Sequence, residues 1–143
     1  RKVMLSDTVG FISRLPTYMI ESFKSTLEEL IRADLVLLML DCSEERESMS
    51  IKLRSCRETL DQLGVDPKKI LVVLNKIDRL EGAALRNLEE DDLFVGLDVM
   101  KISAVKGDGL RQLKNRIIAA TYPPNQGRAG REQTATPPRF QRA

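Results

Sequence analysis

Three short sets of polar and small residues have types and spacing that could bind a ligand. In chain order they are Asp7-Thr8-Val9-Gly10, Asn75-Lys76-Ile77-Asp78 and Ser103-Ala104. Each set follows a short apolar run of the length of a buried strand. Ligands of open α/β sheets bind beyond the carboxyl ends of the strands. We therefore expect the three sets to line one edge of a sheet.

The first set has the form D-x-x-G, which suits magnesium and phosphate. Asp7 could hold Mg²⁺ through a water molecule, because this ion gives up its hydration shell reluctantly. Gly10 has no Cβ, so its backbone N–H could approach a γ-phosphate closely. Thr8 and Val9 would lie in the same loop. A simple turn after a strand gives the same pattern, so this set does not decide the function alone.

The second set, N-K-x-D, suits recognition of guanine. The Asp78 carboxylate can accept hydrogen bonds from the guanine N1–H and the exocyclic amino group, which adenine cannot match. Asn75 can donate to N7 and tie neighbouring loops, and the stem of Lys76 can lie along the base. A polar site of this kind rejects analogues that leave its groups unpaired. The motif follows a five-residue apolar run directly.

The third set could support the same base. The small side chains of Ser103 and Ala104 would let a backbone N–H reach the guanine carbonyl oxygen. The glycines of Gly107-Asp108-Gly109 follow, so a loop with a helix cap is the alternative interpretation. A phosphate-cradling loop of the form G-x-x-x-x-G-K-[ST] has no match among the eight glycines.

Hydrophobic periodicity predicts the elements that position these sets. Apolar runs predict strands, and apolar residues at three- and four-residue spacing predict helices. Strand, helix, strand alternation indicates a parallel sheet with helices on both faces, hence the α/β class. The expected strands are 2–6, 35–41, 70–74 and 99–102, and the expected helices 19–31, 49–63, 83–90 and 110–120. Gly64 should end the second helix in a left-handed conformation.

Composition narrows the class of protein. Hydrophobic residues make up 42% of the 143 and charged residues 31%, which is ordinary for a soluble domain. The longest apolar run, Leu35 to Leu40, is six residues, whereas a membrane span needs roughly 18. Two cysteines without motif spacing fit a reducing cytoplasm. The absence of histidine excludes His-based zinc ligation and Ser-His or Cys-His catalysis.

The end of the chain differs from the rest. Residues 123–143 carry four arginines and one glutamate among Pro, Gly, Gln and Thr. We expect a disordered basic tail here, with an RNA-contacting arm as the alternative. The remaining residues 1–122 are nearly neutral, so no direct DNA binding is expected.

Longer stretches around the motifs resemble a known family. They are SDTVGFI at 6–12, LP at 15–16, ESFKSTLEE at 21–29 and ADL at 33–35. From Val3 to about Ala120 the chain resembles the second part of the GTPase domain of the HflX family, ribosome-associated translational GTPases of the P-loop class. In that fold the phosphate loop and the first strand precede the part that this chain resembles. Since the chain begins with Arg1, we expect it to be a fragment without them, with residues 1–122 forming a partial GTPase domain.

The resemblance implies roles for the motif residues. GTP or GDP with Mg²⁺ would be the ligand, Asp7 the Mg²⁺-linked carboxylate and Gly10 the γ-phosphate sensor. Asn75, Lys76 and Asp78 would read guanine, and the loop of Ser103, Ala104 and Val105 would support the base. Val105 stands where a lysine is often found, but the key contact there is from the backbone. The large ribosomal subunit would be the partner.

The resemblance assigns no catalytic residue. Phe11 stands where many GTPases place a glutamine that orients the attacking water, so intrinsic hydrolysis should be slow. Arg14 is a candidate charge stabiliser, with a solvated loop arginine as the alternative. We expect the chain alone to bind GTP or GDP weakly without hydrolysing GTP. The other hypotheses are a non-catalytic ribosome- or protein-binding module, and an unrelated α/β protein with chance motifs.

Overall fold

The computed structural model describes residues 3–7 and 29–122. Its sheet has three parallel strands, β1 (Val36–Asp41), β2 (Ile70–Asn75) and β3 (Val99–Lys101), in the order β1-β2-β3. Asp41 pairs with Asn75 in the register, and Leu74 pairs with Lys101. The three strands therefore end at one edge, as the sequence predicts.

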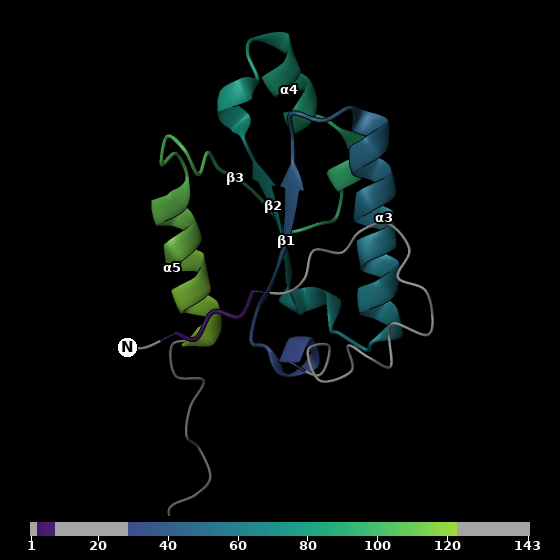
Figure 1. The fold of residues 1–143 in the computed structure, drawn as a ribbon, viewed down its shortest axis with the longest axis vertical. Coiled ribbons are helices and arrows are strands. Elements are labelled where there is room, and N and C mark those ends of the chain that lie inside the picture. The colour runs from purple at the N-terminus through teal and green to yellow at the C-terminus, as the bar shows by residue number, and fades with distance from the viewer. Residues whose placement is uncertain (1–2, 8–28, 123–143) are drawn as a thin grey trace, which may run out of the picture.

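Three helices surround this sheet. They are α3 (Arg46–Gln62), α4 (Ala83–Glu89) and α5 (Leu110–Thr121), and residues 29–32 are also helical. Short 3₁₀ turns η1 (Pro67–Lys69), η2 (Ile77–Arg79) and η3 (Asp92–Phe94) join the elements. In Figure 1, α3 and α5 flank the sheet on opposite sides, and α4 lies beyond the carboxyl ends of the strands. None of the helices in the described ranges is both long and apolar enough to cross a membrane.

The central strand divides the core between the two faces of the sheet. Val72 and Leu74 of β2 pack into the core that β1 shares with α3. Leu71 and Val73 point the other way and pack with Leu113 of α5. All four β2 side chains are at most 1% exposed. Alternate side chains of a strand point to opposite faces, so a strand covered on both sides reads as a continuous apolar run. The predicted α/β fold with helices on both faces is confirmed.

The glycine that the sequence predicts just after the end of α3 has the expected left-handed conformation. Gly64 has φ of 74°, its N–H donates to the Asp61 carbonyl at 2.9 Å, and the Val65 N–H donates to the Leu60 carbonyl at 3.0 Å. This pair of bonds is the Schellman arrangement, which satisfies carbonyls at the end of a helix. Strand 36–41 and helix 110–121 also lie within one residue of their predicted bounds.

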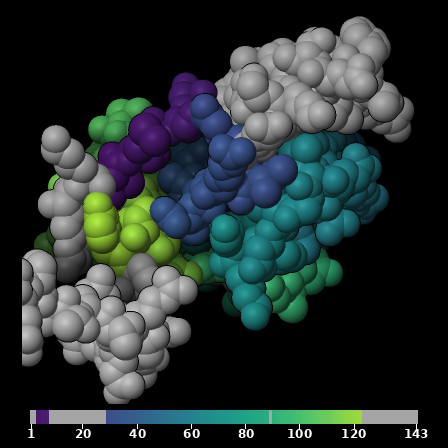
Figure 2. All heavy atoms as spheres, turned by 90° about the horizontal axis from the view of Figure 1, so that it is seen from below, coloured from purple at the N-terminus to yellow at the C-terminus, as the bar shows by residue number. Residues whose placement is uncertain are grey.

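The prediction of a buried strand at 2–6 is wrong for residues 3–6. These residues have no strand structure, and Met4 and Leu5 are 95% and 78% exposed. Figure 2 shows the segment 3–7 lying over the outside of the molecule. A strand needs a hydrogen-bonded neighbour to satisfy its backbone groups, and no described strand pairs with this segment. An apolar run alone does not supply that neighbour.

Other predictions lie outside the described residues. These are Thr8, Val9 and Gly10, the loop with Phe11 and Arg14, most of helix 19–31, and the tail 123–143.

Candidate functional site

The carboxyl ends of the three strands are tied together by backbone hydrogen bonds beyond the strands themselves. The Cys42 N–H donates to the Asn75 carbonyl at 3.0 Å, and the Cys42 thiol donates to the same oxygen at 2.9 Å. On the other side of β2, the Ile77 N–H donates to the Ile102 carbonyl at 3.3 Å. The second and third sequence motifs are therefore neighbours at one edge of the sheet.

Asn75 joins two loops through its side chain. Its Oδ1 accepts hydrogen bonds from the N–H of Lys76 at 2.8 Å and from the N–H of Ala104 at 3.1 Å. Among the described residues, its side-chain NH₂ group has no hydrogen-bond partner. That donor is thus free for a ligand, while the acceptor fixes the loop after β3.

Lys76 departs from ordinary backbone geometry. It has φ of 70°, and it is the only non-glycine residue with positive φ in the described part of the chain. Left-handed conformations bring the Cβ of an L-residue close to the following carbonyl oxygen, so they are unfavourable outside glycine. The Lys76 ammonium forms an ion pair with Oδ2 of Asp41, the last residue of β1.

Asp41 is held from its other side as well. Its Oδ1 accepts hydrogen bonds from the Ser43 N–H at 3.0 Å and the Ser43 hydroxyl at 2.6 Å. Burial alone would raise the pKa of Asp41, but the hydrogen bonds from Lys76 and Ser43 outweigh it and lower the pKa to about 2. Asp41 is therefore ionised at neutral pH.

Asp78 is positioned by a residue of the third motif. The hydroxyl of Ser103 donates to Oδ1 of Asp78 at 2.5 Å, and this bond is the main cause of a lowered Asp78 pKa. Ser103 is fully buried, and its hydroxyl oxygen also accepts the Lys106 N–H at 3.0 Å. Asp78 itself is half-buried, so the carboxylate remains accessible.

The loop after β3 depends on one glycine. Ala104 and Val105 are exposed, and Val105 is 88% exposed. The loop closes through hydrogen bonds from the Ser103 N–H to the Asp108 carbonyl and from the Gly107 N–H to the Ser103 carbonyl, at 3.0 and 2.8 Å. Gly109 has φ of 73°, and a Cβ there would lie 2.3 Å from the Lys101 carbonyl oxygen. Only glycine fits this position without movement of the backbone.

The first motif is not brought to this group by the described residues. Asp7 ends the exposed segment 3–7, and Thr8, Val9 and Gly10 lie outside the described ranges. Within residues 3–7 and 29–122, no group of three or more acidic or cysteine side chains could hold a metal ion. Asp7 alone does not make a magnesium site.

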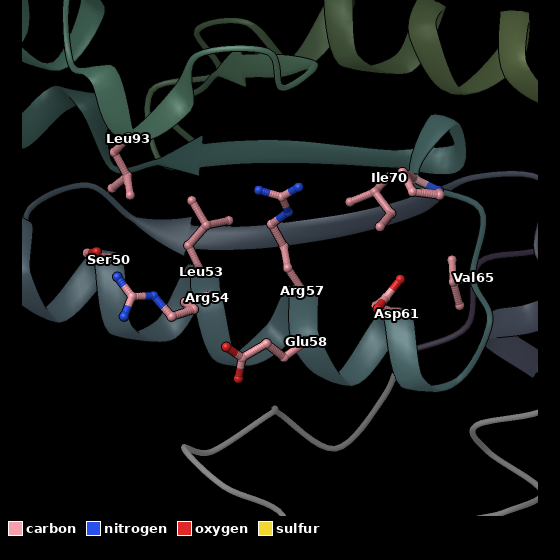
Figure 3. A pocket seen from close by; sticks show the side chains of 10 residues that line it. Ser50, Leu53, Arg54, Arg57, Glu58, Asp61, Val65, Ile70 and Leu93 are labelled. Atoms are coloured by element: carbon pink, nitrogen blue, oxygen red, sulfur yellow. The ribbon is translucent and has the colours of Figure 1, made fainter.

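A separate pocket of about 380 Å³ lies along α3. Figure 3 shows Leu53, Val65, Ile70 and Leu93 around it, with charged side chains of α3. The charges are balanced between Arg54 and Arg57 on one hand and Glu58 and Asp61 on the other. Since Ile70 begins β2, this pocket includes the amino end of that strand and none of the motif residues.

Sequence reasoning missed the part that Asp41 plays. The only signal was an Asp directly after the apolar run 35–40, and a solvent-exposed aspartate at the end of a strand gives the same pattern. It likewise missed that the Ser103 side chain, and not only its small size, contributes to the site.

Comparisons with known proteins agree with these motifs. No protein-family model matches the chain. The GTPase HflX of Lacrimispora saccharolytica is 40% identical over 116 residues, covering 80% of this chain and 26% of the relative. The GTPase HflX of Saccharolobus solfataricus is 37% identical over 123 residues, covering 82% and 35%. By sequence, this chain belongs to the HflX family of GTPases.

Solved structures of related proteins have the same fold. A GTP-binding protein from Sulfolobus solfataricus in complex with GDP matches with a TM-score of 0.60 and 34% identity, over 80% of this chain and 39% of that one. A mutation variant of SsGBP matches with a TM-score of 0.65 and 36% identity, over 85% and 44%. The chain spans about a quarter to a third of the length of its HflX relatives.

Proposed function

We propose that the strand-end edge formed by Asn75, Asp78, Ser103 and Ala104 is the guanine-reading part of a GTP or GDP site. The observation that carries this proposal is the hydrogen bond of 2.5 Å from the Ser103 hydroxyl to Asp78 Oδ1. It fixes one oxygen of a half-buried carboxylate and orients the whole group before a ligand arrives.

The chemistry of the edge favours guanine over adenine. An ionised carboxylate accepts hydrogen bonds and donates none, so Asp78 suits the N1–H and exocyclic amino group of guanine. Adenine has an acceptor at N1, which would face the carboxylate without a proton between them. The free NH₂ group of Asn75 can donate to N7 of the base. In the exposed loop after β3, the Ala104 N–H already donates to Asn75 Oδ1, so the Val105 N–H is the donor proposed for the guanine carbonyl oxygen.

The relatives support a guanine nucleotide as the ligand. The matching curated proteins are named GTPase HflX, and a matching structure holds GDP. Mg²⁺ enters this proposal only through Asp7, which would act through a water molecule, with Gly10 sensing the γ-phosphate and Thr8 and Val9 in the same loop.

GTP hydrolysis and a ribosomal partner are proposed for a full-length protein of this family. There the domain would hydrolyse GTP slowly and associate with the large ribosomal subunit in the cytoplasm. The support for these points is membership of the family, together with Phe11 in place of a water-orienting glutamine.

Nucleotide titration followed by two-dimensional ¹H–¹⁵N NMR tests the binding proposal. We expect GDP to shift the backbone amide signals of Lys76, Asp78 and Ala104, and ADP at the same concentration to leave them in place. Equal shifts with both nucleotides would mean that the edge does not read the base. No shift with GDP up to millimolar concentration would overturn guanine binding by this chain.

A further inference from the structure

We propose that Asp41 is a positioning residue for guanine recognition, which it serves by holding the ammonium group of Lys76. This inference rests on the proposed guanine site and assigns a role to a residue outside the sequence motifs. Its basis is a set of contacts at the end of β1.

The sheet register brings the two residues together. Asp41 pairs with Asn75 across the parallel strands, so Lys76 leaves β2 directly beside the end of β1. The Lys76 ammonium then reaches Asp41 Oδ2, 35 positions away in the chain. A charge-assisted contact between strand ends is strong when both groups are partly removed from water, and the two side chains are 39% and 22% exposed.

The contact fixes both ends of the lysine. The Lys76 N–H donates to Asn75 Oδ1 at 2.8 Å, and the ammonium is bound by Asp41. The methylene stem between them is consequently held at the adjoining carboxyl ends of β1 and β2. A stem held at both ends loses little conformational freedom when a flat base packs against it.

The carboxylate is itself held in place. Ser43 donates two hydrogen bonds to Asp41 Oδ1, at 3.0 and 2.6 Å, which leaves Oδ2 for the lysine. The Cys42 N–H and thiol bind the Asn75 carbonyl, so the two strand ends cannot separate without losing these bonds. Residues 41–43 thus form a support for the Lys76 side chain.

Asp41→Asn tests the proposal, with Asp98→Asn as the matched control. Asp98 also forms an ion pair, with Arg116, but it lies just before the amino end of β3. We expect Asp41→Asn to weaken GDP binding about tenfold, because the long Lys76 side chain would then have to be ordered when the base binds. Asp98→Asn should leave GDP binding within about twofold, as for an exposed pair.

A second readout separates positioning from general structural support. Reductive methylation followed by peptide mass spectrometry measures how fast each lysine reacts. In Asp41→Asn, Lys76 should react several-fold faster relative to the exposed Lys68 than it does in the unmodified chain. A double-mutant cycle with Lys76→Gln should show strongly non-additive losses of GDP affinity, because both changes remove the same arrangement.

The outcomes distinguish this inference from the proposed function. If the unmodified chain does not bind GDP, the guanine site and the role of Asp41 fail together. If it binds GDP but Asp41→Asn behaves like Asp98→Asn, or the losses of GDP affinity in the double-mutant cycle add, only the role of Asp41 is overturned.

Should Asp41→Asn fail to fold, Ser43→Ala makes the same test, since it frees Asp41 while keeping the carboxylate. We then expect about threefold weaker GDP binding and faster methylation of Lys76, and unchanged values for both would overturn the proposal.

Discussion

At the scale of single residues, the site is built from polar side chains that hold one another. Ser103 holds Asp78, Asn75 holds Lys76 and Ala104, and Asp41 holds Lys76. Each side chain is thereby oriented by a partner from a different strand end. Polar groups oriented in this way need little reorganisation when a ligand binds.

Asp78→Asn should change which base is bound. Asparagine offers one acceptor and one donor, whereas guanine presents two donors to this position and xanthine presents a donor and an acceptor. We expect GDP affinity to fall at least about tenfold and xanthosine diphosphate to bind better than GDP. Competition titrations with the two nucleotides measure the change. Asp92→Asn is the control, because the Asp92 side chain is 87% exposed. Retention of the GDP preference would show that Asp78 does not contact the base.

Asp41 should contribute stability that depends on pH in the acid range. Its pKa is about 2 in the folded chain, below the ordinary 3.8. The contribution is therefore complete above about pH 4 and is lost as pH falls through about 2. With its side chain 22% exposed, we estimate it at about 1 kcal/mol.

Urea unfolding at several pH values measures this contribution. The stability difference between the unmodified chain and Asp41→Asn should shrink as pH falls from 5 to 2. For Ile51→Ala, a change of an exposed apolar side chain, the difference should stay constant with pH. An Asp41→Asn difference that does not vary with pH would contradict the lowered pKa.

At the scale of elements, the ends of strands and helices determine where the motif residues lie. The loop from β3 to α5 reverses at Gly109, with a left-handed backbone pressed against the Lys101 carbonyl. The start of α3 is tied to η3 by Arg46, which binds Asp91 through two hydrogen bonds of 2.8 Å and Asp92 through one of 2.5 Å. These ties connect the segments that follow β1 and β2.

Gly109→Ala should destabilise the fold more than an alanine at another left-handed glycine. The new Cβ would meet the Lys101 carbonyl oxygen at 2.3 Å, in addition to the strain of φ at 73°. We expect a loss of about 2 to 4 kcal/mol in the free energy of unfolding. Gly64→Ala, with φ of 74° and no atom within 4 Å, should lose about 1 kcal/mol. Chemical denaturation measures both, and equal losses would show that the backbone at Gly109 relaxes.

At the scale of the whole molecule, the described residues supply the proposed base-reading edge of the sheet and no phosphate loop. The sequence contains no G-x-x-x-x-G-K-[ST] segment, and β1 lies at one edge of the sheet formed by the described strands. Binding energy in this chain should thus come from the base and not from the phosphates.

A series of ligands tests this division. Guanosine, GMP and GDP should bind the chain with dissociation constants within about tenfold of one another, which is 1.4 kcal/mol. All should be weaker than micromolar, and GTP should not be hydrolysed. Calorimetric titrations and a phosphate-release assay make the measurements, with adenosine as the control. Submicromolar GDP binding that depends on Mg²⁺ would contradict the expectation of a partial site.

The sequence by itself determined the α/β class, the two strands predicted at 35–41 and 70–74 to within one residue, and the neighbourhood of the N-K-x-D and Ser103-Ala104 motifs. Apolar periodicity and strand-end position are local signals, and parallel strands end at a common edge. Only the tertiary structure decided that residues 3–6 form no strand, because pairing needs a neighbour that an apolar run cannot specify. It alone joined Asp41 to Lys76 and Ser103 to Asp78, since contacts 35 and 25 positions apart depend on register and on side-chain direction.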